Sequence, residues 1–259
     1  MIKQSKYLHR YKKDGYAIIK NLFEPKIIKE LNEHVNWLRK KHPNTRPEAF
    51  HHNLLVKDPF IHYLINQKKL LNIVEEVLGP DIALFGAHYI AKKPLDGRPI
   101  GWHQDGSYWP LKPMEVLSVW VACTKSDRNN ACMRVIPGSQ DMKIIKPSKM
   151  IKLDLNKFVL DLAIDSKMID ETKAVDIELN PGDISIHNPL IIHGSNSNHS
   201  KTWRIGLTLR YIPTTTFVDK ENWDCILLRG KASKKANNQY IDRPRYVRGL
   251  HMPFAGCDK

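Results

Sequence analysis

From residue 82 onwards the sequence consists of short β-prone runs with glycine, proline, asparagine and aspartate between them. The runs cover residues 82–91, 116–123, 133–136, 175–179, 183–186, 189–193 and 203–212. Many short strands separated by turn residues are typical of a β-sandwich or barrel. We therefore predict a mainly β fold with flanking helices, whose core is a double-stranded β-helix of the jelly-roll, cupin-like type.

The first 80 residues follow a helical pattern over most of their length. A turn signal at Asp14-Gly15 precedes one short β-prone run at residues 16–19. Apolar residues then recur at helical spacing over residues 25–38, and a second helical region covers residues 61–78. We expect these helices to pack against one sheet and not to carry a site.

The length of 259 residues is sufficient for one large domain with a substantial buried core. Because no linker-like segment divides the chain, we expect residues 1–259 to form a single domain. Within it we expect a largely helical buttress (1–80), the jelly-roll core (82–217) and a basic C-terminal segment (218–259). Residues 140–170 have a mixed pattern, and we expect them to form an insertion over the site.

The chain carries 41 Lys and Arg against 27 Asp and Glu, which gives a net charge of +14. Such a charge favours an anionic partner, either a small molecule or a nucleic acid. The basic residues are spread along the chain, and no nucleic-acid-binding motif accompanies them. A solvated basic surface and a small-molecule substrate are therefore the favoured interpretation, although the charge alone leaves nucleic acid open as a partner.

Other features bear on the cellular setting. No run of about 18 apolar residues exists, so we expect no membrane span, and the N-terminus lacks an apolar signal core. These observations predict a cytoplasmic protein. The four cysteines form no CxxC pair, so we expect reduced, unpaired thiols and no zinc site. Nothing in the sequence indicates the oligomeric state.

A candidate metal site lies in the segment around His103-Gln104-Asp105. On an extended backbone, alternate residues point to the same face, so His103 and Asp105 can reach one metal while Gln104 points away. One imidazole and one carboxylate suit Fe(II), with a second histidine completing the facial set. A chain of this composition is expected to contain about one His-x-Asp pair by chance. The metal-site prediction therefore depends on the downstream sequence.

That downstream sequence contains His193 after an apolar run, and Arg204 eleven residues later. We expect His193 to be an inward-facing third ligand. His187 is its nearby rival, but Asn188-Pro189 interrupts the strand between them. Arg204 can hold the distal carboxylate of 2-oxoglutarate through two parallel hydrogen bonds. Gly206 leaves room beside Arg204, and Ser195 shares a face with His193 and can donate to the same carboxylate.

The order and spacing of these residues resemble the phytanoyl-CoA dioxygenase family. The resemblance extends from Asp14-Gly15-Tyr16 through Lys93-Pro94, the residues 102–105, Trp120, the residues 130–139 and His193-Gly194-Ser195 to Arg204. One departure is Asn130-Ala131-Cys132 where relatives typically have Asn-Gly-Cys, which makes a positive φ at residue 131 less favourable.

The resemblance implies a 2-oxoglutarate-dependent dioxygenase that uses Fe(II), 2-oxoglutarate and O₂. It implies iron bound by His103, Asp105 and His193. It places 2-oxoglutarate on Arg204 and Ser195, with Trp120 against it and Tyr89 near another contact. The implied reaction is hydroxylation of an unactivated C–H bond in a small metabolite, with release of succinate and CO₂. Halogenating relatives have a small residue at the position of Asp105, so the carboxylate favours hydroxylation, desaturation or ring formation.

Residues that flank the metal ligands are candidates for contact with the substrate. Trp102, Ser107 and Trp109 surround the ligand loop, and His88 lies on a predicted strand that faces the site. The basic surface favours an anionic substrate such as a carboxylate or a phosphate ester.

Two other functions fit parts of the pattern. Arg204, Thr208 and Arg210 resemble the arginine-rich strand of nucleic-acid-directed oxidative demethylases, but Gly206 replaces the asparagine of that pattern. A non-catalytic jelly-roll module that binds a metal or a small ligand is the second alternative. Strongly salt-dependent nucleic-acid binding would support the first, and the absence of succinate formation would support the second.

Overall fold

The computed structural model describes residues 5–257 and consists of two antiparallel sheets with helices against one of them. The larger sheet has six strands in the order β1 (Tyr16–Ile19), β10 (Ile184–His187), β5 (Leu117–Ala122), β12 (Arg204–Pro213), β2 (Ile82–Lys92) and β14 (Ile226–Arg229). The smaller sheet has four strands in the order β3 (Ile100–His103), β11 (His193–Ser195), β6 (Met133–Val135) and β9 (Val175–Ile177). This architecture is the predicted mainly β fold.

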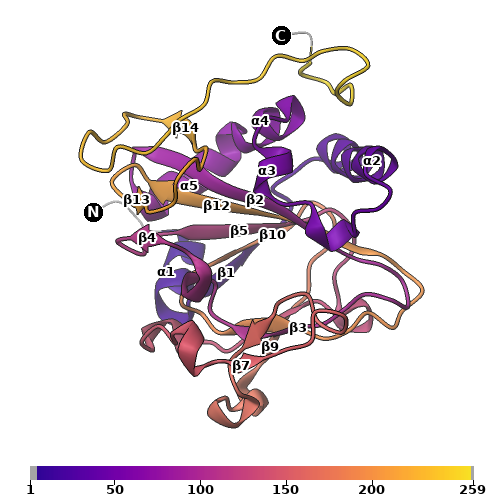
Figure 1. Cartoon of the computed structure of the whole chain (residues 1–259), viewed down its shortest axis with the longest axis vertical. Helices are drawn as coiled ribbons and strands as arrows, with labels where there is room; N and C mark the ends of the chain where they lie inside the picture. Colours follow the sequence, from indigo (N-terminus) through magenta and orange to yellow (C-terminus); the bar gives the residue numbers. More distant parts are fainter. Residues whose placement is uncertain (1–4, 258–259) are drawn as a thin grey trace.

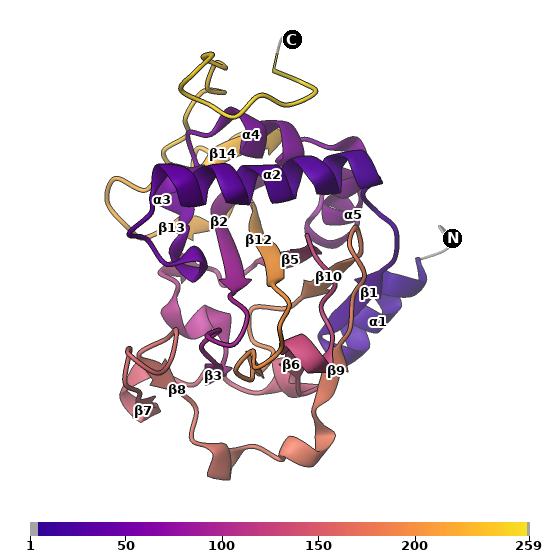
Figure 2. The ribbon, with the colours of Figure 1, turned by 90° about the vertical axis from the view of Figure 1, so that its right-hand side faces the viewer.

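Two short strand pairs and several helices complete the described chain. The strand pairs are β4 (Leu111–Lys112) with β13 (Phe217–Val218) and β7 (Ile151–Lys152) with β8 (Leu162–Ala163). The α-helices are α1 (Lys6–Asp14), α2 (Pro25–Lys41), α3 (His52–Leu55), α4 (Pro59–Ile65) and α5 (Lys68–Leu78). Figure 1 shows α2, α3 and α4 above the six-stranded sheet, with β3 and β9 below it. Figure 2 shows α2 crossing over the ends of β2 and β12.

The larger sheet has two different faces because side chains alternate along each strand. On β12, the residues Ile205, Leu207, Leu209 and Tyr211 belong to the main hydrophobic cluster with the helices. The intervening positions of the same strand, Arg204, Thr208 and Arg210, line a cavity on the opposite face. The helix-facing side therefore supplies the core, and the side that faces the smaller sheet is free to carry polar groups.

The helical part agrees with the sequence pattern, with one correction. In α2 the apolar positions Ile28, Leu31, Val35 and Leu38 are buried, as their helical spacing predicts. The second helical region is not continuous. It divides into α4 and α5 at Asn66-Gln67, where the carbonyl of His62 accepts a hydrogen bond from the Asn66 side chain. That side chain competes with the helical backbone, which favours a break.

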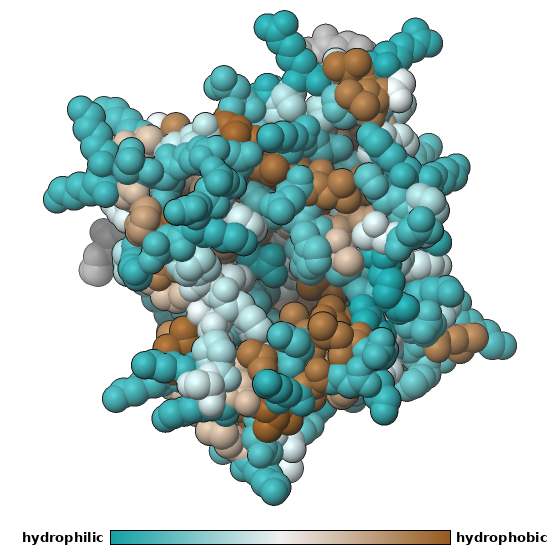
Figure 3. Space-filling view, in the orientation of Figure 1, coloured by the Kyte–Doolittle hydropathy of each residue, from teal (hydrophilic) through white to brown (hydrophobic). Residues whose placement is uncertain are grey.

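The strand predictions hold for most runs, but not for residues 189–193. There the chain forms a turn, in which the Asn188 side chain accepts from the backbone of Leu190, and the strand begins at His193. The strand at Ile100–His103 was not predicted, because its glycine and proline neighbours look like a loop. The insertion around residues 140–170 lies along the smaller sheet and carries exposed apolar side chains at Met142, Ile144, Ile151, Leu155 and Met168. Figure 3 shows a largely hydrophilic face with scattered hydrophobic patches, several of them in its lower half.

The C-terminal segment also differs from the expectation. Residues 226–229 form β14, which pairs with β2 at the edge of the larger sheet, so the sheet extends beyond the expected core boundary at 217. Further on, Phe254 packs against Phe60 and Tyr63 of the helical layer. The backbone N–H of Ala255 donates to Glu30 of α2. Residues 218–259 therefore contribute packing as well as positive charge over their described part.

Ala131 corrects a further expectation. It ends a 3-10 turn (Arg128–Asn130) with a φ of 65°, in the left-handed region, although it carries a Cβ. The turn is held by Asp127, whose side chain accepts from the backbone of Asn129 and Asn130, while the Asn130 side chain accepts from Asp127. These bonds fix the turn strongly enough to keep alanine in a conformation that glycine adopts more easily.

Two further observations concern the described residues. Cys123, Cys132, Cys225 and Cys257 are all unpaired. No helix in residues 5–257 combines the length and the apolar character that a bilayer-crossing segment needs.

Candidate active site

Three side chains with metal-binding atoms converge in the cavity between the sheets. His103 is the last residue of β3, Asp105 opens the 3-10 helix η2 (Asp105–Tyr108), and His193 begins β11. His103 and His193 are direct neighbours in the register of β3 and β11. One ligand atom from each of the three residues lies within 4.8 Å of the others, and all three residues are buried. The i, i+2 spacing of His103 and Asp105 thus brings both to one point.

The intervening Gln104 points away from the site, as predicted. Its backbone is extended, with φ −107° and ψ 125°. Its amide nitrogen donates to the carbonyl of Leu190 at 2.8 Å, and its amide oxygen accepts from the backbone of Ile145 at 2.8 Å. Gln104 therefore ties the ligand loop to the segment before His193 and to the insertion.

Backbone carbonyls set the protonation pattern of the two histidines. Nδ1 of His103 donates to the carbonyl of Gly101 at 2.9 Å, and Nδ1 of His193 donates to that of Ile191 at 3.1 Å. The Nε2 atoms are consequently left as lone-pair donors, and they lie 3.6 and 3.9 Å from Oδ1 of Asp105. Burial lowers the pKa of His193 to about 3, helped by the nearby His103, so this imidazole is neutral at neutral pH. Neutral imidazole is the form that binds metals.

Asp105 is ionised despite its burial. Burial by itself would raise the pKa of its carboxyl, but the charge of Arg210 and the nearby imidazoles of His103 and His187 hold that pKa well below its usual value. The Ser118 hydroxyl of β5 lies 3.5 Å from Oδ2 as a further donor. The site therefore offers a cation one ionised carboxylate and, at His193, a neutral imidazole.

Arg204 lies in the same cavity with a buried, largely unpaired guanidinium. Its side chain is almost fully buried, and its Nε and one terminal nitrogen have no hydrogen-bond partner among the described residues. Burial lowers the pKa of Arg204 to about 10, which still leaves it charged at neutral pH. A buried cation without acceptors is costly unless a ligand supplies them.

Trp120 stands beside Arg204, and Gly206 makes that possible. The Arg204 guanidinium carbon lies 5.5 Å from the centre of the Trp120 ring. A Cβ on residue 206 would lie 1.9 Å from the ring carbon Cζ2 of Trp120. The room that glycine was expected to leave beside Arg204 is thus filled by the indole ring. Ser195 also lines the cavity, and its buried hydroxyl has no partner in the described part of the chain.

Lys92 holds the strand that carries these residues in place. It is 1% exposed, pairs with Arg204 in the register of β2 and β12, and donates to the carbonyls of Ser195 and Asn196. Burial and the charge of Arg204 lower the pKa of Lys92 well below its usual value. Its hydrogen bonds connect the end of β11 to the larger sheet.

The remaining predicted site residues divide into two groups. Trp109 and His88 line the cavity, as expected. Trp102 packs with the apolar cluster under the insertion, with Arg134 over its ring, and Ser107 donates to the carbonyl of Ile145. Trp102 and Ser107 are therefore not among the residues that line the cavity.

Tyr89 is a clear correction. It is fully buried on the helix-facing side of β2, where its hydroxyl lies 3.0 Å from Nδ1 of His34. Alternation along the strand explains the error, because the neighbours His88 and Ile90 point into the cavity instead. A shift of one residue in aligning the motif changes the face.

Several cavity residues were not selected from the sequence, although His187 was considered as a rival ligand. His187 is 2% exposed, its Nε2 lies 3.8 Å from Oδ2 of Asp105, and both ring nitrogens lack hydrogen-bond partners within residues 5–257. His51, Thr208 and Arg210 also line the cavity. Thr208 and Arg210 were named from the sequence only for the nucleic-acid alternative, and their alternation along the strand with Arg204 brings both into the cavity.

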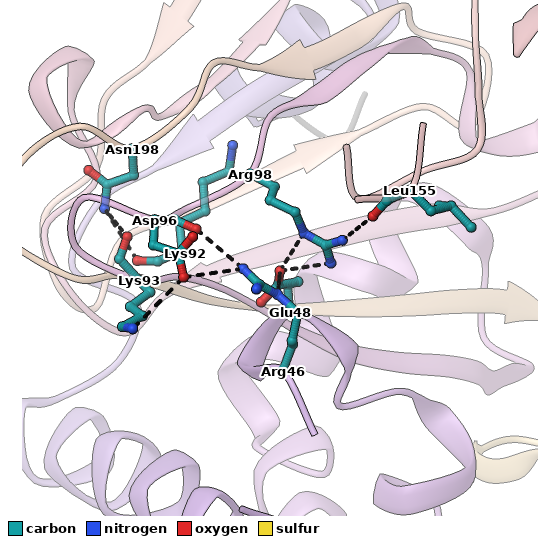
Figure 4. A network of polar contacts seen from close by, with 8 residues as sticks. All are labelled: Arg46, Glu48, Lys92, Lys93, Asp96, Arg98, Leu155 and Asn198. Carbon is teal, nitrogen blue, oxygen red and sulfur yellow. Dashed lines mark hydrogen bonds and ion pairs between the residues drawn. The ribbon is translucent and has the colours of Figure 1, made fainter. Parts of the chain in front are cut away.

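A polar network at the cavity edge joins three segments (Figure 4). Glu48, which is 4% exposed, accepts from Arg46 at 2.6 Å and from Arg98 at 2.9 Å. Arg98 also donates to the carbonyl of Leu155 in the insertion. The backbone carbonyl of Glu48 accepts from Nε2 of His88 at 2.8 Å. The network thus orients His88 and fastens the insertion to the helical layer.

Comparison with known proteins agrees with this arrangement. The sequence model of the family described as phytanoyl-CoA dioxygenase (PhyH) matches residues 11–206. The peroxisomal phytanoyl-CoA dioxygenase of Homo sapiens is 29% identical over 197 residues, covering 73% of this chain and 53% of the relative. A probable alpha-ketoglutarate-dependent hypophosphite dioxygenase of Stutzerimonas stutzeri is 24% identical, covering 60% and 56%. The chain spans about half the length of the curated relatives it matches.

Solved structures with the same fold include oxygenases. The apo form of the non-haem monooxygenase ThoJ superposes with a TM-score of 0.76 at 22% identity, covering 91% of this chain and 87% of that one. EctD from S. alaskensis with bound Fe gives a TM-score of 0.68 at 18% identity, covering 84% and 79%. These similarities establish the shared fold. Because the family's sequence model matches well over half of the chain, the protein belongs to the phytanoyl-CoA dioxygenase family, as its motifs predicted.

Proposed function

We propose that this protein is an Fe(II)- and 2-oxoglutarate-dependent dioxygenase that hydroxylates an unactivated C–H bond of a small metabolite. The observation that carries the proposal is the combination within one cavity of the His103, Asp105 and His193 ligand atoms with the unpartnered guanidinium of Arg204. Two imidazoles and one carboxylate on one face of a metal suit non-haem iron. Family membership supports the same reaction class.

The residues present fit both the metal and the cosubstrate. His103, Asp105 and His193 would hold iron, and Arg204 with Ser195 would hold the distal carboxylate of 2-oxoglutarate. The buried nitrogens of Arg204 and the hydroxyl of Ser195 lack partners in the described structure, which is what a site for a carboxylate requires. Trp120 forms the wall beside Arg204.

Each side chain then has a defined role. Iron with 2-oxoglutarate and O₂ supplies the oxidising power, and succinate and CO₂ are the co-products. The carbonyls of Gly101 and Ile191 hold His103 and His193 in the tautomer that presents Nε2. Apolar cavity residues, namely Ile90, Ile100, Met133, Val159 and Leu160, exclude water from the C–H bond that reacts. Asp105 occupies the position that a halide requires in halogenating relatives, so hydroxylation is the favoured outcome.

Metal binding and turnover test the proposal separately. Wild-type protein loaded with Fe(II) without oxygen is expected to bind 2-oxoglutarate and, after oxygen is added, to form succinate. Asp105→Ala is expected to lose iron binding and succinate formation, whereas His199→Ala, a histidine on the exposed surface, serves as the control. Arg204→Ala is expected mainly to raise the 2-oxoglutarate concentration that is required. Unchanged activity in Asp105→Ala would disprove the ligand assignment.

The same measurements separate the two alternatives. A binding module would bind iron or a ligand without forming succinate under any condition, including the slow uncoupled reaction. A demethylase acting on nucleic acid would bind DNA or RNA with an affinity that falls steeply as salt concentration rises. We propose a small-molecule substrate because the cavity is partly apolar and holds a few converging polar groups.

A further inference from the structure

Two cavities meet beside the proposed iron site. The inner cavity, of about 270 Å³, is lined by the iron ligands and Arg204, and the outer one, of about 340 Å³, extends towards Trp223. The residues that line both are His51, His88, Tyr108, Trp109 and Arg210. Arg210 is the cationic side chain of this shared wall. It borders both cavities.

Contacts with carbon atoms hold the side chain of Arg210 in place. Among the described residues, no hydrogen-bond acceptor lies within bonding distance of its Nε. It lies opposite Gly86 in the register of β12 and β2. A Cβ at residue 86 would come within 3.3 Å of Cδ of Arg210, so the glycine leaves the arginine its path into the cavity. The guanidinium carbon is 5.1 Å from the centre of the Trp109 ring. Such stacking orients a guanidinium and leaves its N–H groups free.

The hydrogen-bonding capacity of Arg210 is unused within the described chain. Its buried Nε has no hydrogen-bond partner there. The nearest carboxylate oxygen, Oδ2 of Asp105, is 3.9 Å from Nε, whereas charge-assisted hydrogen bonds are about 2.7–2.9 Å long. Arginine remains charged in proteins even when buried. Arg210 is thus a second unsatisfied cation in the cavity that holds Arg204.

If the proposed function holds, the charge of Arg204 is balanced by the cosubstrate and that of Arg210 is not. The two positive charges of Fe(II) and that of Arg204 are matched by the Asp105 carboxylate and the two carboxylates of 2-oxoglutarate. Burial lowers the pKa of His51, and it lowers the pKa of His88 to about 3, so these imidazoles add no charge at neutral pH. One positive charge, on Arg210, then remains without a counterpart.

We propose that Arg210 binds an anionic group of the substrate, a carboxylate or a phosphorus oxyanion, at the junction of the two cavities. The inference rests on the proposed function and adds a substrate class to it. Because Nε of Arg210 lies 3.9 Å from an oxygen of an iron ligand, a bound anion lies next to the metal. The carbon that is oxidised is therefore within about three bonds of the anionic group. Organic acids and phosphonates that react close to their charged end have this chemistry.

Calorimetry on protein loaded with Fe(II) and 2-oxoglutarate in the absence of oxygen tests the anion site directly. The probes are propionate and methylphosphonate, with propionamide as the neutral counterpart of the first. Wild-type protein is expected to bind at least one of the two anions and not the amide. Arg210→Met, which keeps the length of the side chain without its charge, is expected to weaken anion binding by roughly 30-fold or more. Arg210→Lys is expected to fall between the two.

A matched control is available in Arg134→Met. Arg134 also stacks on a tryptophan, at 5.2 Å from the ring centre of Trp102, but it lies outside both cavities. It is expected to bind the anions as the wild type does. Circular dichroism and thermal unfolding of each variant establish that it folds. If Arg210→Met does not fold, Arg210→Lys has to show weakened anion binding for the proposal to hold.

Titration of 2-oxoglutarate in the same variants supplies the decisive comparison. The proposal expects its affinity to change by less than about threefold in Arg210→Met. If 2-oxoglutarate binding weakens and anion binding does not, Arg210 belongs to the cosubstrate site and the proposal is wrong. Equal binding of propionamide and propionate would overturn it too. Failure of the proposed function is a different result, because wild-type protein would then bind neither iron nor 2-oxoglutarate.

Discussion

Gly206→Ala is the substitution whose effect follows most directly from the structure. The new Cβ would lie 1.9 Å from Cζ2 of Trp120, whereas carbon atoms in contact are about 3.5–4.0 Å apart. The ring therefore has to retreat by roughly 1.5 Å, although Trp120 is only 3% exposed and packed between the sheets. Overpacking of this kind costs about 1–3 kcal/mol. Loss of the contact between Trp120 and Arg204 adds about 0.5–2 kcal/mol.

Once the indole ring of Trp120 is removed, Gly206→Ala is expected to change the stability of the fold in the opposite direction. Gly206 does not have a positive φ, so alanine fits its backbone. In a Trp120→Val background, Gly206→Ala is expected to stabilise the fold by about 0.5–1 kcal/mol, because alanine loses less backbone entropy on folding. The coupling between the two positions is then about 2–6 kcal/mol.

Urea unfolding of the four proteins at one temperature, followed by far-ultraviolet circular dichroism, measures this coupling. Each alanine variant is compared with its own parent, so the cost of losing the indole cancels. The affinity for 2-oxoglutarate is a second readout. Gly206→Ala is expected to lower it in the wild-type background and to leave it unchanged relative to the parent in the Trp120→Val background. If Gly206→Ala is equally destabilising in both backgrounds, the glycine is not needed to make room for Trp120. The proposed packing of Trp120 between Gly206 and Arg204 would then be wrong.

Two further substitutions test the corrections that the structure made. Ala131→Gly is expected to stabilise the protein by about 1 kcal/mol, because a left-handed alanine costs roughly 1–2 kcal/mol and the added chain entropy of glycine offsets about 0.4–1 kcal/mol. A melting temperature higher by about 2–4 °C would confirm it, and a lower one would contradict it. Tyr89→Phe is expected to lower stability by about 1–3 kcal/mol through the lost contact with His34, and to leave the 2-oxoglutarate requirement unchanged. A raised requirement would show that the hydroxyl does serve the cosubstrate.

The sequence determined the sheet architecture because alternation and turn residues are local signals. Seven β-prone runs were recognised, and the smaller sheet and the larger sheet both draw on them. Local signals cannot show which neighbouring strand a segment with low β propensity will pair with. Ile100–His103 becomes a strand only because β11 pairs with it, and Ile226–Arg229 only because β2 offers an open edge. Such strands depend on tertiary context and not on their own propensity.

The candidate site was predictable where the sequence separation of two residues determines which way their side chains point. His103 and Asp105 share a face by their separation of two, and His193 joins them through the β3–β11 register, which the sequence does not state. Tyr89 shows the limit of the same logic. An error of one residue in placing a motif on a strand moves a side chain from the cavity to the helix-facing core.

Several residues of the candidate site lie on one strand, β12, because alternate positions of a strand face the same side. Its cavity-facing positions are Arg204, Gly206, Thr208 and Arg210, spaced by two, while the alternate positions anchor the strand in the main core. The glycine admits Trp120 beside the first arginine, and a second glycine, Gly86 on β2, admits the side chain of the last. Arg204 is buried and Arg210 is largely buried, and two guanidinium groups in one cavity repel each other unless anions lie between them. Their position on the same face is the reason why we propose that the cavity receives two anions, 2-oxoglutarate at Arg204 and an anionic substrate at Arg210.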